Sequence, residues 1–289
     1  WIAEGGSQAS LLAAPAKGIS ALNRRPLIFS ALNRRPLIFG LCTLLLGAVI
    51  TGVAIWNLKP TPAPSPRPVT RTVIALPPGD QLATGNSSSA VALSPDGSQL
   101  AYVATRGSVQ QIFLRRLDGL EARPIAGTEG ASSPFFSPDG QWLGFFASGS
   151  LKKISVSGGA AVTLRGTIVG ARGASWVGDG TIVISPSISS GLQQLSDAGG
   201  VSHPFIPLSD GEFSQRWPEL LPGDKAVLYV AGGSSNPRIA AQSLSTGQRR
   251  DLVPGGTFPR YAPSGHLIYA QAGNLMAVPF DAQELQITG

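Results

Sequence analysis

Few residues of this 289-residue chain are of the types that catalyse reactions or bind metals. The chain has two histidines, His203 and His266, and one cysteine, Cys42, so a zinc site built from such ligands is excluded by number. His203 precedes a proline in an expected loop, and His266 follows an expected turn, where a solvated side chain is the simpler interpretation. We assign neither histidine a role.

Catalytic motifs are absent as well. No Gly-x-Ser-x-Gly segment provides a hydrolase nucleophile, and no His-Arg-Asp or Asp-Phe-Gly segment provides the catalytic and metal-binding groups of a protein kinase. The sequence therefore predicts no catalytic residue, no metal ligand and no cofactor in this chain, and hence no enzyme activity of its own.

Aspartates recur in similar surroundings at Asp96, Asp139 and Asp179, which raises the question of calcium. A calcium loop needs several oxygen ligands close together, whereas each of these segments contains a single acid. We therefore interpret the recurring positions as structural turn residues, in which aspartate accepts backbone hydrogen bonds and glycine takes positive φ. The predicted set is Asp96, Gly97, Asp139, Gly140, Asp179, Gly180, Gly223, Asp224 and Gly265.

The clearest of these turns lies in the segment Phe135–Phe146. Two phenylalanines lead into Ser-Pro-Asp-Gly, and an apolar run leads out, which is the pattern of strand, tight turn and strand. Related hairpins surround the other turns of the set. Aligning them on Gly97, Gly140, Gly180, Asp224 and Gly265 gives steps of 43, 40, 44 and 41 residues.

A steady period in the low forties, strand-like throughout, is typical of propeller blades with four short strands each. A second feature recurs in phase, because similar strands end in turns near Gln111–Gly119, Lys152–Gly159, Leu192–Gly200 and Ile239–Gly247. Arg71–Leu76 predicts a first strand. The predicted fold class is therefore all-β: a β-propeller of about five visible four-stranded blades, incomplete as a ring, over residues 71–289, preceded by one transmembrane helix.

Net charge separates the two parts of the chain. Residues 1–70 carry seven Lys or Arg and one acid, whereas residues 71–289 carry fifteen of each sign. The propeller has no overall positive field, so we predict no nucleic-acid partner. The basic arm at 1–36 contains a tandem duplication, Ser20–Phe29 and Ser30–Phe39, which we interpret as a recent genetic or assembly event that doubles an arginine cluster.

The segment 37–58 predicts a transmembrane helix. Its 22 uncharged residues would span roughly 33 Å at about 1.5 Å per residue, which matches a bilayer core. Trp56 suits the membrane interface, and the arginines before the span favour a cytoplasmic N-terminus. A cleaved signal peptide would be shorter, with a small-residue cleavage site. A buried core helix would not be apolar on all sides.

Five alternating prolines between Lys59 and Thr70 predict an extended linker at 59–70. It would hold the propeller a short distance from the membrane. A ligand for a proline-recognition domain is the alternative, and the expected position outside the cytoplasm argues against it.

A family resemblance rests on a string of segments in a fixed order after the span and the linker. These segments are Leu76–Gly79, Ala92–Gly97, Gly127–Ala131, Pro134–Gly140, Leu151–Lys153, Arg172–Trp176, Arg216–Gly223 and Ala277–Asp281. The order resembles the C-terminal half of bacterial eukaryotic-like serine/threonine protein kinases that carry a TolB-like, WD-repeat-like propeller outside the membrane. It covers about residues 36–289.

This resemblance implies a cytoplasmic kinase domain before Trp1 and further blades after Gly289. The decamer duplication departs from the family pattern, and no kinase residue is carried over, because no kinase motif is present. The implied protein is a single-pass protein of the bacterial inner membrane. Its N-terminus would be cytoplasmic, and its periplasmic or extracellular propeller would bind a protein or small-molecule ligand.

Two other functions stay open at this point. The propeller could gate a membrane-bound prolyl-oligopeptidase-like peptidase whose hydrolase domain follows Gly289. It could also be a periplasmic scaffold without a signalling role. The coding sequence on either side of this chain distinguishes all three, because each places a different domain there or none.

Overall fold

The computed structural model describes residues 44–49, 51–52, 73–83, 85, 88–233 and 235–289, and the chain divides into two compact units, Trp1–Thr72 and Val73–Gly289. Residues 44–49 and 51–52 of the first unit are helical. Over the described residues, no helix has the length and apolar character needed to cross a membrane. Most of the predicted span at 37–58, the arm at 1–36 and the linker at 59–70 lie outside these residues.

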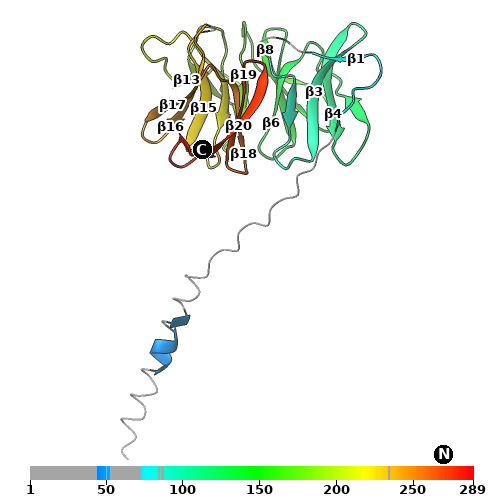
Figure 1. Ribbon diagram of the computed structural model, residues 1–289. Helices are drawn as coiled ribbons and strands as arrows, with labels where there is room; N and C mark the ends of the chain where they lie inside the picture. The colour runs from blue at the N-terminus through cyan, green and yellow to red at the C-terminus, as the bar shows by residue number, and fades with distance from the viewer. Residues whose placement is uncertain (1–43, 50, 53–72, 84, 86–87, 234) are drawn as a thin grey trace, which may run out of the picture. The chain divides into compact units, whose positions relative to one another are not determined.

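The second unit is a five-bladed β-propeller in which every sheet is antiparallel (Figure 1). The strands of the first blade are β1 (Asp80–Leu82), β2 (Val91–Leu93), β3 (Gln99–Arg106), β4 (Val109–Arg116) and β5 (Ala122–Pro124). Those of the second are β6 (Ser132–Phe136), β7 (Trp142–Ala147), β8 (Ser150–Ser155) and β9 (Val162–Arg165). In the first blade β1 and β2 both pair with β3, so two short strands share the innermost position.

The remaining blades have four strands each, paired in sequence order. The third contains β10 (Ala174–Trp176), β11 (Thr181–Ile184), β12 (Leu192–Ser196) and β13 (His203–Ile206). The fourth contains β14 (Gln215–Leu220), β15 (Ala226–Ala231), β16 (Arg238–Ser243) and β17 (Arg249–Pro254). The fifth contains β18 (Thr257–Ala262), β19 (His266–Gln271), β20 (Asn274–Asp281) and β21 (Gln286–Ile287).

The predicted repeat is confirmed. The hairpins found in the sequence form the strand pairs β2–β3, β6–β7, β10–β11, β14–β15 and β18–β19. The second recurring feature forms the strands that follow these hairpins in four blades, which are β4, β8, β12 and β16. The described part of the predicted first strand at Arg71–Leu76, residues 73–76, forms no strand, so the prediction is wrong there. The first strand is β1, because Pro77 and Pro78 interrupt the chain and Leu76 packs against Tyr102 and Phe113 instead of joining a ladder.

The hydrophobic core lies between the blades. Alternate side chains of one strand point to opposite faces, and both faces are buried in blades that have two neighbours. In β7, Leu143 and Phe145 join the cluster shared with the first blade, whereas Phe146 joins the cluster shared with the third. Phe136 and Phe135 divide in the same way. The aromatic residues around the Ser-Pro-Asp-Gly turn therefore connect three blades.

Consecutive blades contact one another through their innermost strands, β2 with β6, β6 with β10, β10 with β14, and β14 with β18. Within the described part of the propeller, no contact of comparable extent joins β18–β21 to the first blade. Large apolar side chains of these two blades are exposed to solvent: Leu93 of β2 is 61% exposed and Leu275 of β20 is 79% exposed. The first and fifth blades thus each keep one face without a neighbouring blade.

Gly144 tests the packing of this core. The ring of Phe135 lies over Gly144 across the β6–β7 ladder, and a Cβ at Gly144 would meet its Cζ at 2.1 Å. We expect Gly144→Ala to destabilise the fold by roughly 3 kcal/mol, the upper range for overpacking. The measurement is urea unfolding followed by tryptophan fluorescence.

Phe135→Leu serves as the partner variant because it removes the ring that clashes. The double variant should lose less stability than the sum of the two single variants, since residues in direct contact are not additive. Additive losses would show that Phe135 does not constrain position 144.

Candidate ligand-binding site

The predicted turn residues lie at one end of the propeller. Because strands alternate in direction, the first and third turns of a blade lie at one end, and the second turn and the connection to the next blade lie at the other. In the Ser-Pro-Asp-Gly turns the side chains close the loop. Ser94 Oγ donates to Asp96 Oδ1 (2.5 Å) and accepts from the backbone N–H of Gln99 (2.9 Å), and Asp96 accepts from the backbone N–H of Ser98 (3.0 Å).

The second blade repeats this arrangement, with Asp139 accepting from Ser137 Oγ (2.5 Å) and from the backbone N–H of Gln141 (3.0 Å). In the third blade Asp179 accepts from the backbone N–H of Thr181 (2.9 Å). In the fourth, a carboxylate oxygen of Asp224 accepts from the backbone N–H of Gly178 of the preceding blade (3.4 Å). The backbone is left-handed at Gly97, Gly140, Gly180, Gly223, Asp224 and Gly265, whose φ values are 71°, 69°, 84°, 82°, 55° and 78°.

Over the described residues, no three His, Cys, Asp or Glu side chains come together in a way that could hold a metal ion. His266 contacts Ser264 within its own turn, through Nδ1 and Oγ at 3.1 Å, and His203 is an exposed residue of β13. None of the turn residues lines a cavity described below. The turn set shapes the chain, and the candidate site lies at the opposite end.

A bulge interrupts the innermost strand near that opposite end in the second, fourth and fifth blades. The register shifts between Ser132 and Phe135, between Arg216 and Glu219, and between Thr257 and Arg260. In each case the residue that follows the start of the register shift has a positive φ; these residues are Ser133 (48°), Trp217 (49°) and Phe258 (52°). The third blade has Gly173 (94°) at the same place.

The residue just before the bulge has an equivalent at the same repeat position in the blades without one. We call these five equivalent residues the mouth ring. Its members lie eight residues before the aligned turn position of their own hairpin and are Ser89, Ser132, Arg172, Arg216 and Thr257. Bulges re-aim side chains at the ends of strands and are common beside binding sites. Because a left-handed non-glycine residue costs about 1–2 kcal/mol, three such residues at one position indicate a geometry imposed by the blade.

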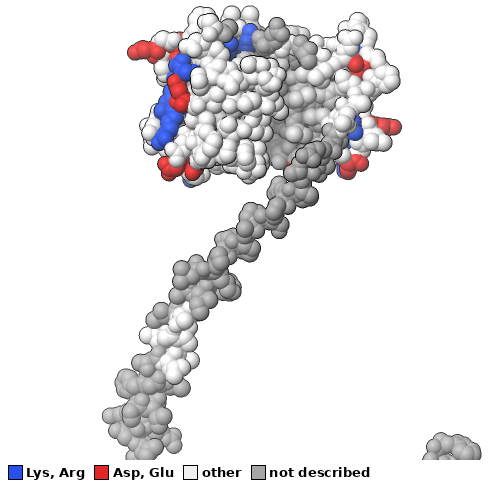
Figure 2. Space-filling view, in the orientation of Figure 1, with Lys and Arg blue, Asp and Glu red and all other residues white. Residues whose placement is uncertain are grey.

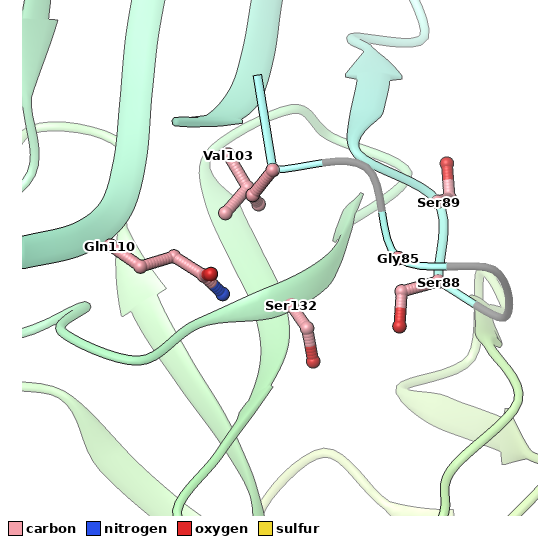
Figure 3. Close-up of a pocket in the computed structure, with 7 residues that line it drawn as sticks. Gly85, Ser88, Ser89, Val103, Gln110 and Ser132 are labelled. Carbon is pink, nitrogen blue, oxygen red and sulfur yellow. The ribbon is translucent and has the colours of Figure 1, made fainter. Parts of the chain in front are cut away.

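Two adjoining cavities are lined in part by three residues of the mouth ring, Ser89, Ser132 and Arg172. The first has a volume of about 220 Å³ and is lined by Ala83, Gly85, Ser88, Ser89, Val103, Gln110 and Ser132 (Figure 3). The second has a volume of about 240 Å³ and is lined by Ser88, Gly130, Ser132, Phe146, Ala147, Ser148, Gly149, Ser150, Ile168, Gly170, Ala171 and Arg172. Ser88 and Ser132 line both cavities, and Figure 3 shows them approaching the space from different segments.

The lining is rich in hydroxyl groups. Gln110 Nε2 donates to the carbonyl of Ala131 (2.7 Å), which fixes its amide beside the first cavity, and Ser132 Oγ donates to the carbonyl of Phe146 at a longer 3.3 Å. Among the residues that line the two cavities there is no His, Cys, Lys or acid, and Arg172 is the single charged group. Such a lining offers hydrogen bonds and one positive charge, without a nucleophile and base in contact.

Arg172 lies two residues before β10, and Arg216 lies on β14 of the next blade. The backbone N–H of Trp217 donates to the carbonyl of Arg172 (2.6 Å), which joins the bulge of the fourth blade to the third blade. Arg172 NH1 donates to the carbonyls of Gly170 and Ala171 at 3.1 Å and 3.0 Å. Arg172 also lines the second cavity.

Arg216 is 8% exposed. Its Nε donates to Ser214 Oγ (2.7 Å), and its NH2 donates to the carbonyl of Gly232 (2.9 Å). Its pKa is lowered, first by burial and second by the positive charge of Arg172. The two arginines thus come from adjoining backbone positions of neighbouring blades, although Arg216 itself lines neither cavity.

Some other arginines of the propeller have carboxylate partners, whereas Arg115 and Arg165 donate to neutral groups. Arg260 pairs with Glu219 (3.0 Å), whose side chain is 25% exposed, and desolvation raises the pKa of Glu219 while Arg260 opposes that shift. Arg106 pairs with Asp80 at 2.6 Å. Within the described residues, neither Arg172 nor Arg216 forms such an ion pair.

Sequence reasoning missed the mouth ring, although a signal was present. The repeat that revealed the turns also fixes every other position of the blade, so a column eight residues earlier contains three hydroxyl residues and two arginines. The sequence does not show that residues of this column lie beside cavities. The cavities depend on bulges and on loops that come from different blades.

Comparison with known proteins supports the fold. Neither a protein-family model nor a curated protein matches the chain. TolB from Acinetobacter baumannii superposes with a TM-score of 0.58 at 22% identity, over 66% of this chain and 51% of that one. A putative TolB from Agrobacterium tumefaciens gives 0.52 at 15% identity, over 69% and 78%. The Cps50 (Swd1) propeller domain of Myceliophteria thermophila gives 0.50 at 13% identity, over 72% of both.

The chain therefore spans about half the length of the A. baumannii TolB that it resembles. At these identities the similarity shows the fold alone. The fold is that of a TolB-like, WD40-like propeller, as the sequence predicted.

The turn aspartates predict how stability depends on pH. Hydrogen bonds from Ser94 and Ser98 lower the pKa of Asp96 from 3.8 to about 2. Because the folded pKa lies below the unfolded one, this carboxylate stabilises the fold above about pH 4, and its contribution is lost as the pH falls toward 2. Hydrogen bonds from Ser137 and Gln141 lower the pKa of Asp139 in the same direction.

We expect the difference in melting temperature between the native chain and Asp96→Asn to be largest above pH 4 and to shrink toward pH 2. Thermal unfolding followed by circular dichroism across this range makes the measurement, with Asp139→Asn as a parallel case. A difference that stays constant from pH 6 to pH 2 would contradict the assigned role of these carboxylates.

Proposed function

We propose that the propeller is a non-catalytic binding module whose ligand enters between the residues of the mouth ring. One observation carries this proposal: three of the five residues at a single repeat position, Ser89, Ser132 and Arg172, line two adjoining cavities at one end of the propeller. Propellers bind ligands where the loops of several blades converge. The lining residues support binding over catalysis, because they offer hydrogen bonds without a general base or a nucleophile beside it.

The surface charge of the propeller is compatible with a small ligand more than with a polyanion. Figure 2 shows acidic and basic side chains of both signs near the margins of the displayed face and a largely uncharged centre. The sequence gives a net charge of zero to residues 71–289. A nucleic-acid partner would require a continuous basic stripe.

The proposed setting is extracytoplasmic. A single span at 37–58 would anchor the chain in a bacterial inner membrane, with a cytoplasmic N-terminus and a proline-rich spacer below the propeller. The arginine cluster before the apolar run supports this orientation. In the parent protein, a receptor-type serine/threonine protein kinase, occupancy of the mouth would regulate a cytoplasmic kinase domain; this part of the proposal depends on the family resemblance and on the TolB-like fold.

Ser132→Trp tests the mouth, because Ser132 lines both cavities and an indole there fills them. Melting temperatures would be measured for the full chain with a panel of sugars, sugar phosphates, amino acids and short peptides. At least one class should raise the melting temperature of the native chain and not that of Ser132→Trp. Lys225→Trp, at an exposed position of a turn at the opposite end, is the control and should respond like the native chain.

A probe that stabilises Ser132→Trp as strongly as the native chain binds elsewhere. That outcome would rule out the mouth as the binding site.

Cysteine labelling tests the orientation. In a Cys42→Ser background, Lys225→Cys should react with a membrane-impermeant maleimide on intact spheroplasts, whereas Ser7→Cys should react only after lysis. The reverse pattern would place the propeller in the cytoplasm. Reaction of both positions only after lysis would contradict an extracytoplasmic propeller as well.

A further inference from the structure

The charge of the mouth ring narrows the class of ligand. Of its five members, three are hydroxyl residues and two are arginines, so none contributes negative charge. The two arginines are consecutive around the ring, on β14 and at the start of the third blade. The positive charge is therefore concentrated on one side of the mouth.

Burial makes this concentration costly. Removing a charged group from water is unfavourable unless hydrogen bonds and an opposite charge compensate for it. Arg216 is more than nine-tenths buried, yet it donates to a hydroxyl and a carbonyl, both of which are neutral. Arg172 likewise donates to carbonyls, and its charge contributes to the lowered pKa of Arg216.

Several carboxylates of the propeller are matched by arginines, among them the buried Glu212, which pairs with Arg238 at 3.3 Å. Glu219, three residues after Arg216 on the same strand, is matched by Arg260 of the next blade. The two mouth arginines have no such match within the described residues. An anion between them would supply the missing negative charge.

The second cavity suits an oxyanion on a small polar body. Its volume of about 240 Å³ corresponds to roughly eight water molecules at about 30 Å³ each. Arg172 lies at its edge, and Ser88, Ser132, Ser148 and Ser150 offer rotatable hydroxyls around it. Guanidinium groups bind phosphate oxygens through two parallel hydrogen bonds, and a dianion balances two arginines.

We infer that the mouth binds the phosphate group of a small hydroxylated phosphomonoester, with Arg172 and Arg216 holding the phosphate and the serines of the second cavity holding the body of the ligand. This inference deepens the proposed function and depends on it. It assigns the two arginines as binding residues and makes the charge of the ligand the main determinant of selectivity.

The test is isothermal titration of the full chain at constant ionic strength with three probes: inorganic phosphate, glucose 6-phosphate and glucose. Both phosphates should bind and glucose should not. Arg172→Gln and Arg216→Gln should each weaken glucose 6-phosphate binding by tenfold to a hundredfold, the range for one charge-assisted contact. Arg123→Gln, which removes an arginine that donates to the carbonyl of Val156 away from the mouth, should leave the affinity unchanged.

Arg216 is buried, so circular dichroism first establishes that its variant folds; Arg172 is half-buried, and its variant alone decides the question if the other does not fold. Phosphate affinities that are the same in Arg172→Gln and the native chain would overturn the inference. If neither phosphate binds but a neutral probe does, and Ser132→Trp abolishes that binding, the inference fails while the proposed function holds. If no probe depends on Ser132, both fail.

Discussion

The structure depends on one constraint, which is that a blade with apolar side chains on both faces must be covered on both faces. Strand alternation sends Phe145 toward the first blade and Phe146 toward the third, so neither cluster is complete within a single blade. Stacking is therefore the only arrangement that removes both faces from water. It also explains why Gly144 has no side chain, because the Phe135 ring occupies that space from the facing strand.

Stacking in turn decides which parts of the chain meet. Because every blade repeats the same strand order, the residue at a given phase of the repeat reaches the same height near the propeller axis. The bulges then set its direction, with Ser133, Trp217 and Phe258 in left-handed conformations that a free chain would avoid. This repetition brings one residue per blade toward the same end, where Ser89, Ser132 and Arg172 line the two cavities.

The two ends of the propeller have different chemistry as a result. At the turn end, aspartates such as Asp96 and Asp139 are satisfied within their own hairpins. At the mouth, Arg172 and Arg216 gather from separate blades and donate to neutral partners, whereas Arg260 is matched by Glu219. Local hydrogen bonds stabilise the first end, and the second end retains positive charge that a ligand can use.

The sequence by itself determined the period, the blade count visible in this chain and the turn chemistry. These features are local: proline, aspartate and glycine specify a tight turn within four residues, and apolar alternation specifies the strands beside it. The same repeat contains the column of Arg172 and Arg216, but sequence reasoning missed it because nothing local marks that column as a site. Only the tertiary structure decided that Ser88, Ser132 and Arg172 border shared cavities, because the distances between blades depend on packing and bulges, which no short segment encodes.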